Sequence, residues 1–222
     1  MKSVQDTVFR AGNIVLFAAV VMSTLVLILI GEPTSYKLLQ EGSVVETATA
    51  LCYLACILLL VFLRPSTPLS LSWPFLLILT FMFLRELDMD KSAFTLGLLK
   101  SRQYTSDAVA LSEKLFSAAI LLLIITSVVI LMKRYSTALI RGIRSGPSYY
   151  RSVGLGIFFT VTSKLIDGLN RKLSTFNLQV SPEAEFWAIV YEEITEFGIP
   201  LSFALAILAL KHKSSLETQT AK

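Results

Sequence analysis

Long apolar stretches separated by short polar segments run along the whole chain. Residues 13–31 and 115–132 contain no charged residue over 19 and 18 positions. A helix of about 20 apolar residues crosses a lipid bilayer. The pattern therefore predicts an all-α membrane protein, a single transmembrane domain over residues 1–222. We expect six transmembrane helices, over residues 13–31, 44–63, 72–90, 115–132, 150–168 and 186–210. A short polar tail over residues 211–222 is expected to follow them.

Two of these segments allow another interpretation. Residues 13–31 could belong to a signal peptide, but they exceed its usual apolar length of about 7–15 residues, and no A-x-A motif precedes Glu32. We expect a retained helix there. Residues 152–163 are the uncharged part of the fifth segment, which spans the bilayer only if Arg151 and Lys164 extend toward opposite surfaces.

The basic residues predict how the helices are oriented. Residues 133–151 contain five lysines and arginines and no acid, which is typical of a cytoplasmic loop. With six helices, this loop and both termini lie on one side, which holds 11 lysines and arginines but only 2 acids. We therefore expect both termini in the cytoplasm, and we expect the protein in a bacterial cytoplasmic (inner) membrane.

The composition excludes several classes of protein. Hydrophobic residues make up 54% of the chain and charged residues 16%, against roughly 25% charged residues in soluble domains. This excludes a soluble enzyme and a disordered chain. The net charge of +4 follows from bases that face lipid headgroups. The lipid bilayer is therefore the expected partner, and nucleic acid is not.

Few residues are available for cofactor chemistry. The one histidine, His212, lies in the tail, which excludes bis-histidine haem, a histidine zinc centre and a Ser-His pair. No G-x-x-x-x-G-K-[ST] motif is present to bind a nucleotide. Cys52 and Cys56 are expected to be small packing residues, with a redox role as the alternative.

The acids gather at the expected extracytoplasmic ends of four helices. A charge within a membrane helix is costly and usually functional. We predict an acid-lined site for a proton, a cation or a substrate, with Arg85 and Lys164 as countercharges. Its predicted members are Glu46, Glu86, Asp90, Asp167, Glu192, Glu193 and Glu196.

Glu196 is the central residue of this prediction. It follows Glu192 by four positions and Glu193 by three, so all three carboxylates are neighbours on a helix. Pro200 cannot donate to the Glu196 carbonyl, and we expect a kink with Gly198 beside it. The alternative is a kinked helix whose acids pair with Arg85, Lys164 or Arg171.

The third helix carries charges on two predicted faces. Glu86 and Asp90 are expected to share one face, and Arg85 and Asp88 are expected to pair on another. Asp88 could instead pair with Lys91.

Two further acids allow a purely local role. Lys164 and Asp167 either form a ladder of polar contacts with Arg171, which lets the polar end of the fifth helix enter the membrane, or supply countercharge to the acids. Glu46 completes a capping box with Ser43, which does not prevent it from facing the other acids. Residues 92–112 either lie along the membrane interface, fold over the acids as a lid, or form a plain loop.

These features leave three hypotheses for function. The first is proton- or cation-coupled transport of a small solute, by a protein we expect to be a homodimer. The second is a membrane-embedded hydrolase or transferase acting on lipids. It would use Mg²⁺, Ca²⁺ or Mn²⁺ if a metal is bound, on Glu86, Glu192 and Glu196. The third is an accessory or assembly subunit. No cofactor is expected under the first.

Overall fold

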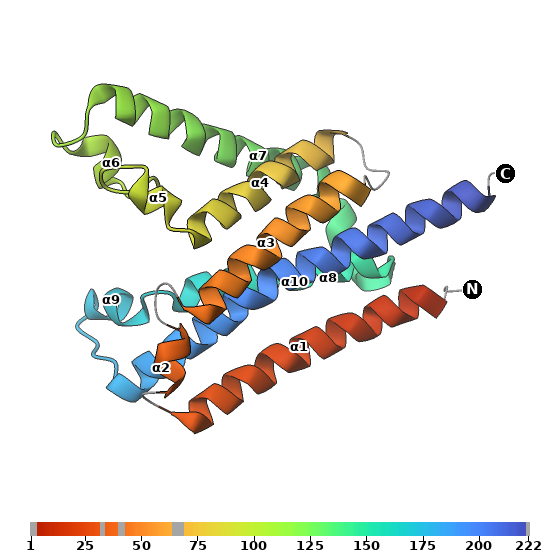
Figure 1. Cartoon of the computed structure of the whole chain (residues 1–222), viewed down its shortest axis with the longest axis horizontal. Helices are drawn as coiled ribbons and strands as arrows, with labels where there is room; N and C mark the ends of the chain where they lie inside the picture. Colours follow the sequence, from red (N-terminus) through yellow and green to blue (C-terminus); the bar gives the residue numbers. More distant parts are fainter. Residues whose placement is uncertain (1–3, 32–33, 40–42, 64–68, 221–222) are drawn as a thin grey trace.

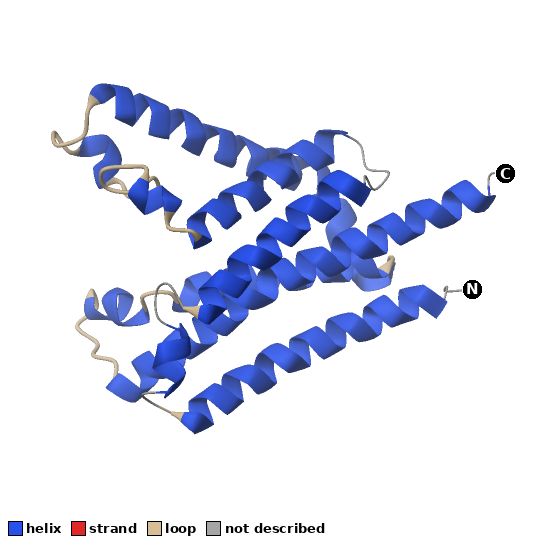
Figure 2. Cartoon of the chain, viewed as in Figure 1, coloured by secondary structure: helices blue, strands red, loops and turns tan. Residues whose placement is uncertain are grey.

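The structure is a computed structural model that describes residues 4–31, 34–39, 43–63 and 69–220. Within these residues the chain is helical and contains no strand (Figure 2). The helices are α1 (Val4–Ile30), α2 (Thr34–Leu39), α3 (Val44–Leu63), α4 (Leu69–Glu86), α5 (Met89–Ser92), α6 (Arg102–Thr105), α7 (Leu111–Ser145), α8 (Ser148–Ile166), α9 (Leu169–Ser174) and α10 (Pro182–Thr220).

Four of the described helices are long and apolar enough to cross a membrane: α1, α3, α7 and α10. The prediction of a helical membrane protein is confirmed at this level. The helices α4 and α8, of 18 and 19 residues, coincide with the other two predicted segments. The count of six spans and the orientation in the membrane stay predictions.

The helix α10 lies at the centre of the bundle. It packs against α1, α3 and α8, and more briefly against α2 and α9 (Figure 1). Two glycines allow the close approach, since a Cβ on Gly198 would lie 2.9 Å from Phe159 and 3.0 Å from Val20, and one on Gly156 would lie 2.7 Å from Phe203. The start of α1 and the end of α10 lie at the same end of the bundle (Figure 1).

The outer helices expose apolar side chains. Leu122, Leu123 and Met132 of α7 are more than half exposed, as are Ile14 and Val15 of α1. A soluble protein rarely leaves so much contiguous apolar surface uncovered. These faces are suited to contact with lipid chains.

Two predicted helix ends are wrong. The third segment does not continue to residue 90, because α4 ends at Glu86 and Asp88 adopts a left-handed conformation with φ 52°. Aspartate tolerates this conformation better than most residues. The fourth segment does not end at residue 132, because α7 continues to Ser145, so most of the expected cytoplasmic loop is helical.

The last helix is continuous where we expected a disturbance. It runs from Pro182 to Thr220 as one α-helix, with Pro200 inside it. The Pro200 carbonyl accepts a hydrogen bond from the Cys56 thiol, at 3.1 Å between sulfur and oxygen. Cys56 is therefore a buried packing residue at the contact between α3 and α10, and both cysteines are free thiols.

Candidate functional site

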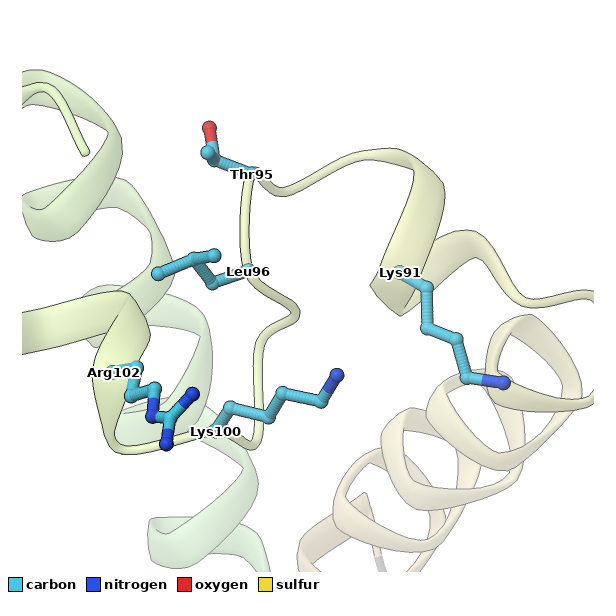
Figure 3. Close-up of a pocket in the computed structure, with 5 residues that line it drawn as sticks. All are labelled: Lys91, Thr95, Leu96, Lys100 and Arg102. Atoms are coloured by element: carbon cyan, nitrogen blue, oxygen red, sulfur yellow. The ribbon is translucent and has the colours of Figure 1, made fainter. Parts of the chain in front are cut away.

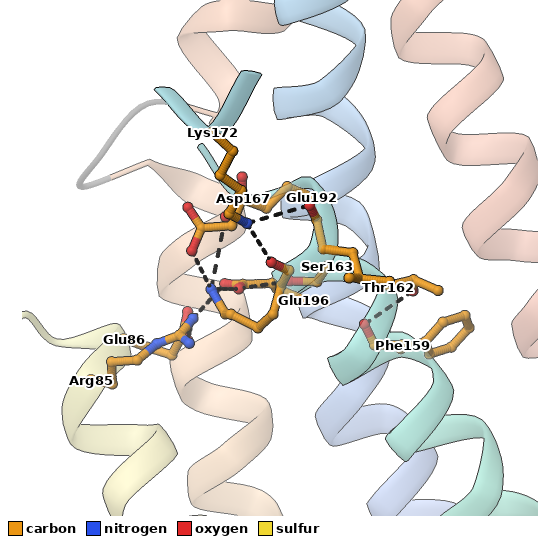
Figure 4. Close-up of polar contacts among 11 residues, drawn as sticks. Arg85, Glu86, Phe159, Thr162, Ser163, Asp167, Lys172, Glu192 and Glu196 are labelled. Atoms are coloured by element: carbon orange, nitrogen blue, oxygen red, sulfur yellow. Dashed lines mark hydrogen bonds and ion pairs between the residues drawn. The ribbon is translucent and has the colours of Figure 1, made fainter. Parts of the chain in front are cut away.

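The ends of α4 and α8 meet the N-terminal half of α10 in a group of charged side chains (Figure 4). Arg85 and Glu86 close α4, and Ser163 and Lys164 lie in the last turn of α8. Glu196 of α10 lies between the two pairs. We call these five residues the Glu196 network.

Glu196 is a buried carboxylate with donors on both oxygens. Its side chain is 9% exposed. Its Oε2 accepts a hydrogen bond from the Arg85 guanidinium at 2.6 Å. Its Oε1 accepts one from the Ser163 hydroxyl at 2.9 Å and lies 2.8 Å from the Lys164 ammonium. Charge-assisted contacts of this length are among the stronger ones in proteins. A single carboxylate therefore joins α4, α8 and α10.

Arg85 corrects the prediction for the third helix. The same guanidinium nitrogen that contacts Glu196 also lies 3.0 Å from Glu86 Oε1. Arg85 therefore belongs to the same site as Glu86 and does not pair with Asp88 on another face. Asp88 pairs with Lys91 at 2.7 Å, which is the alternative we left open. The face assignment failed because the helix ends before Asp88.

Lys164 lies among three carboxylates. Its ammonium is 3.1 Å from Asp167, 3.9 Å from Glu192 and 2.8 Å from Glu196. The local pair with Asp167 and the contact with the acids of α10 are thus both present. Lys172 donates to the carbonyls of Lys164 and Leu165, which closes the end of α8.

The remaining predicted acids lie around the network in different ways. Glu193 is partly exposed, and the charges of Glu46, Glu86, Glu192 and Glu196 act on it. Glu46 donates its backbone N–H to the Ser43 hydroxyl at 3.4 Å, so Ser43 caps the start of α3. The second half of the capping box, from the Ser43 backbone N–H to the Glu46 carboxylate, stays a prediction.

Asp90 lies outside the network. It belongs to α5 rather than to a continued α4, so it does not share a helix face with Glu86 as predicted. One of its carboxylate oxygens is buried without a hydrogen-bond partner among the described residues.

Sequence reasoning missed two residues of the site. Ser163 donates to Glu196, and its position seven residues after Gly156 and eleven after Ser152 would have placed it on the same small, buried face of α8. Tyr53 of α3 is fully buried, and its hydroxyl has no hydrogen-bond partner in the described part of the chain. The charges of Arg85, Glu86 and Glu196 act on this hydroxyl. No motif marks an aromatic residue of this kind within an apolar helix.

The acids do not form a compact ligand set. Among the described residues, no three histidines, cysteines or acids are placed to hold a metal ion. The divalent-metal site on Glu86, Glu192 and Glu196 therefore stays an expectation.

A pocket of about 230 Å³ lies elsewhere, between α5 and α6 (Figure 3). It is lined by Lys91, Thr95, Leu96, Lys100 and Arg102. None of these residues is in the Glu196 network.

The segment between α5 and α7 is folded rather than loose. The Glu113 carboxylate accepts hydrogen bonds from the Thr95 backbone at 2.7 Å and from the Gln103 amide at 2.7 Å. Gln103 is fully buried and accepts from the Leu96 backbone at 2.9 Å. These contacts hold the start of α7 against the segment, which does not contact the Glu196 network through any of them.

Comparisons with models of known protein families, with curated proteins and with solved structures gave no match. The described chain is a helical protein with four helices long and apolar enough to cross a membrane, and the Glu196 network is its most distinctive charged site.

Proposed function

We propose that the chain is a small membrane transporter that couples the movement of a solute to protonation of Glu196. The observation that supports this most directly is the sharing of one buried carboxylate by two cations from different helices. A protein needs no such arrangement to hold its helices together, because buried ion pairs are often no more stabilising than apolar contacts. Ionisable groups within membrane helices commonly serve proton or ion movement.

Protonation would change the contacts between the helices. An ionised Glu196 holds Arg85 of α4 and Lys164 of α8 against α10. A neutral Glu196 would attract neither cation strongly. Each cation has another carboxylate within reach, since Arg85 already contacts Glu86 and Lys164 already contacts Asp167. The network can therefore exist in two charge-paired states, which is what a coupled transporter requires.

The groups around Glu196 come from α3, α4, α8 and α10 itself. Its carboxylate contacts Arg85 of α4 and both Ser163 and Lys164 of α8. Tyr53 of α3, Glu86 of α4 and the two acids Glu192 and Glu193 of α10 lie near it, and Glu46 and Asp167 lie next to those acids.

The proposal is tested with purified protein in liposomes that enclose a pH-sensitive dye. A panel of amine, carboxylate and neutral solutes is added outside, and the change in internal pH is followed. We expect one class of solute to drive a proton flux with the unmodified protein, and we expect Glu196→Gln to abolish it. Glu183→Gln is the matched control, because Glu183 is exposed at the start of α10. Undiminished flux through a folded Glu196→Gln protein would refute the proposal, as would no flux with any solute.

A further inference from the structure

We infer that the solute is an organic ammonium ion, and that Glu193 of α10 and Tyr53 of α3 bind it beside the Glu196 network. This inference rests on the proposed function and names the class of substrate. It starts from two groups that the network does not use, a carboxylate and a buried hydroxyl.

The first observation is a surplus of negative charge. Five carboxylates belong to the network or lie beside it, namely Glu86, Asp167, Glu192, Glu193 and Glu196. Arg85 and Lys164 contact four of these five, all except Glu193. Glu193 has no ion pair or hydrogen bond to its carboxylate among the described residues. A carboxylate that is partly buried beside other carboxylates favours a positively charged partner.

The second observation is the Tyr53 hydroxyl. The side chain is fully buried, and the hydroxyl is unpaired within the described part of the chain. Most buried polar groups in proteins find a hydrogen-bond partner, so an exception calls for an explanation. The charges of Arg85, Glu86 and Glu196 act on this hydroxyl, so it lies near the Glu196 network.

The packing of α3 on α10 brings these two groups to the same side. The contact of Cys56 with Pro200 fixes the register, and the two helices run in the same direction (Figure 1). One turn back along α3 is Tyr53. One and two turns back along α10 are Glu196 and Glu193. Residues spaced three, four or seven apart share a helix face, so Tyr53 and Glu193 both belong to the faces that meet at this contact.

The arrangement suits an ammonium ion better than a bare metal ion. The acids are too far apart for three of them to hold one metal ion, as far as the described residues show. An organic ammonium ion carries several N–H donors on a larger body and can reach separate acceptors. Its N–H groups would donate to the Glu193 carboxylate and to the Tyr53 oxygen. The Tyr53 ring adds an attraction for the cation.

The test is the binding of ethylammonium to the purified protein, measured by titration calorimetry at neutral pH. We expect saturable binding to the unmodified protein. Tyr53→Phe keeps the ring and removes the hydroxyl, and we expect it to weaken binding roughly tenfold, as for a lost hydrogen bond to a charged group. Glu193→Gln should weaken binding by at least about tenfold, because it removes the charge.

Matched controls separate the site from general effects. Tyr150→Phe lies at the opposite end of α8, and Glu183→Gln lies at the exposed start of α10. Both should bind ethylammonium like the unmodified protein. Tetraethylammonium, which has no N–H group, should bind more weakly than ethylammonium. Sodium should not displace ethylammonium at equal concentration.

Several outcomes would overturn the inference. They are no saturable binding of ethylammonium, equal affinity in the folded Tyr53→Phe and Glu193→Gln proteins, equal affinity for tetraethylammonium, and displacement by sodium. Glu196→Gln separates this inference from the proposed function. A proton flux driven by another solute, without amine binding, would support the transporter proposal and refute the ammonium site. Amine binding without any proton flux would support the ammonium site and refute the transporter proposal.

Discussion

Removal of the Glu196 side chain is the sharpest test of how the bundle is held together. Glu196→Ala would leave the guanidinium of Arg85 and the ammonium of Lys164 without their shared partner. Removing one member of a buried ion pair costs about 3–5 kcal/mol. Arg85 is 20% exposed and keeps Glu86, while Lys164 is 41% exposed and keeps Asp167. Both cations therefore keep a second carboxylate and some contact with solvent. We expect the free energy of unfolding to fall by an amount near the lower value, about 3 kcal/mol.

The loss is measured as the free energy of unfolding in mixed micelles, by titration with a denaturing detergent while helical circular dichroism is recorded. Asp88→Asn is the matched control, because the pair of Asp88 with Lys91 is 41% and 49% exposed and asparagine, like aspartate, tolerates the left-handed backbone at this position. Exposed pairs contribute about 0–1 kcal/mol. The double variant of Arg85→Met and Glu196→Met should be more stable than either single variant, since apolar residues can replace a buried ion pair.

Two results would refute this reasoning. One is a loss in Glu196→Ala no larger than in Asp88→Asn. The other is a double variant in which the two single effects simply add, since residues in contact should show a coupling energy of about 0.5–3 kcal/mol.

Four further predictions concern the same bundle. Ser163→Ala removes a donor to a charged carboxylate and should lower the unfolding free energy by about 1.5 kcal/mol in the same detergent titration. Gly198→Ala should cost about 1–3 kcal/mol, because the new Cβ would lie 2.9–3.0 Å from side chains of α1 and α8. Gly12→Ala should have the opposite sign, with a gain of about 0.5–1 kcal/mol, since its Cβ would meet its neighbour at an ordinary 3.7 Å within a helix. In a variant without native cysteines, Asp107→Cys should react with a membrane-impermeant thiol reagent from outside the cell and Ser136→Cys only after lysis; the reverse pattern would contradict the predicted orientation.

The apolar pattern predicted the helices better than it predicted their ends. The segment over residues 44–63 coincides with α3, where Ser43 caps the first turn and the apolar run is unbroken. The boundary failed at Asp88, because a charged stretch can either continue a helix or turn, and single residues do not decide which. It failed again after residue 132, because α7 continues through a basic stretch that contains good helix-forming residues until Gly146 and Pro147.

The members of the charged site could be predicted more readily than their partners. Glu196, Glu192 and Lys164 follow from the cost of a charge in an apolar helix, which is visible in the sequence. Arg85 was predicted as a countercharge for the acids, but the particular carboxylate that it contacts depends on how α4 crosses α10. Tyr53 could not be recognised as a site residue for a related reason. A tyrosine in an apolar helix is ordinary in the sequence, and only the structure shows that its hydroxyl has no hydrogen-bond partner among the described residues.

The central place of α10 has a consequence for how the protein is made. Because α10 follows α1, α3 and α8 in the chain, the ribosome synthesises it after all three of them, yet all three pack against it. Until α10 has been made, Arg85 and Lys164 lack the carboxylate that joins them in the finished bundle. Closure of the bundle therefore has to wait for the arrival of α10.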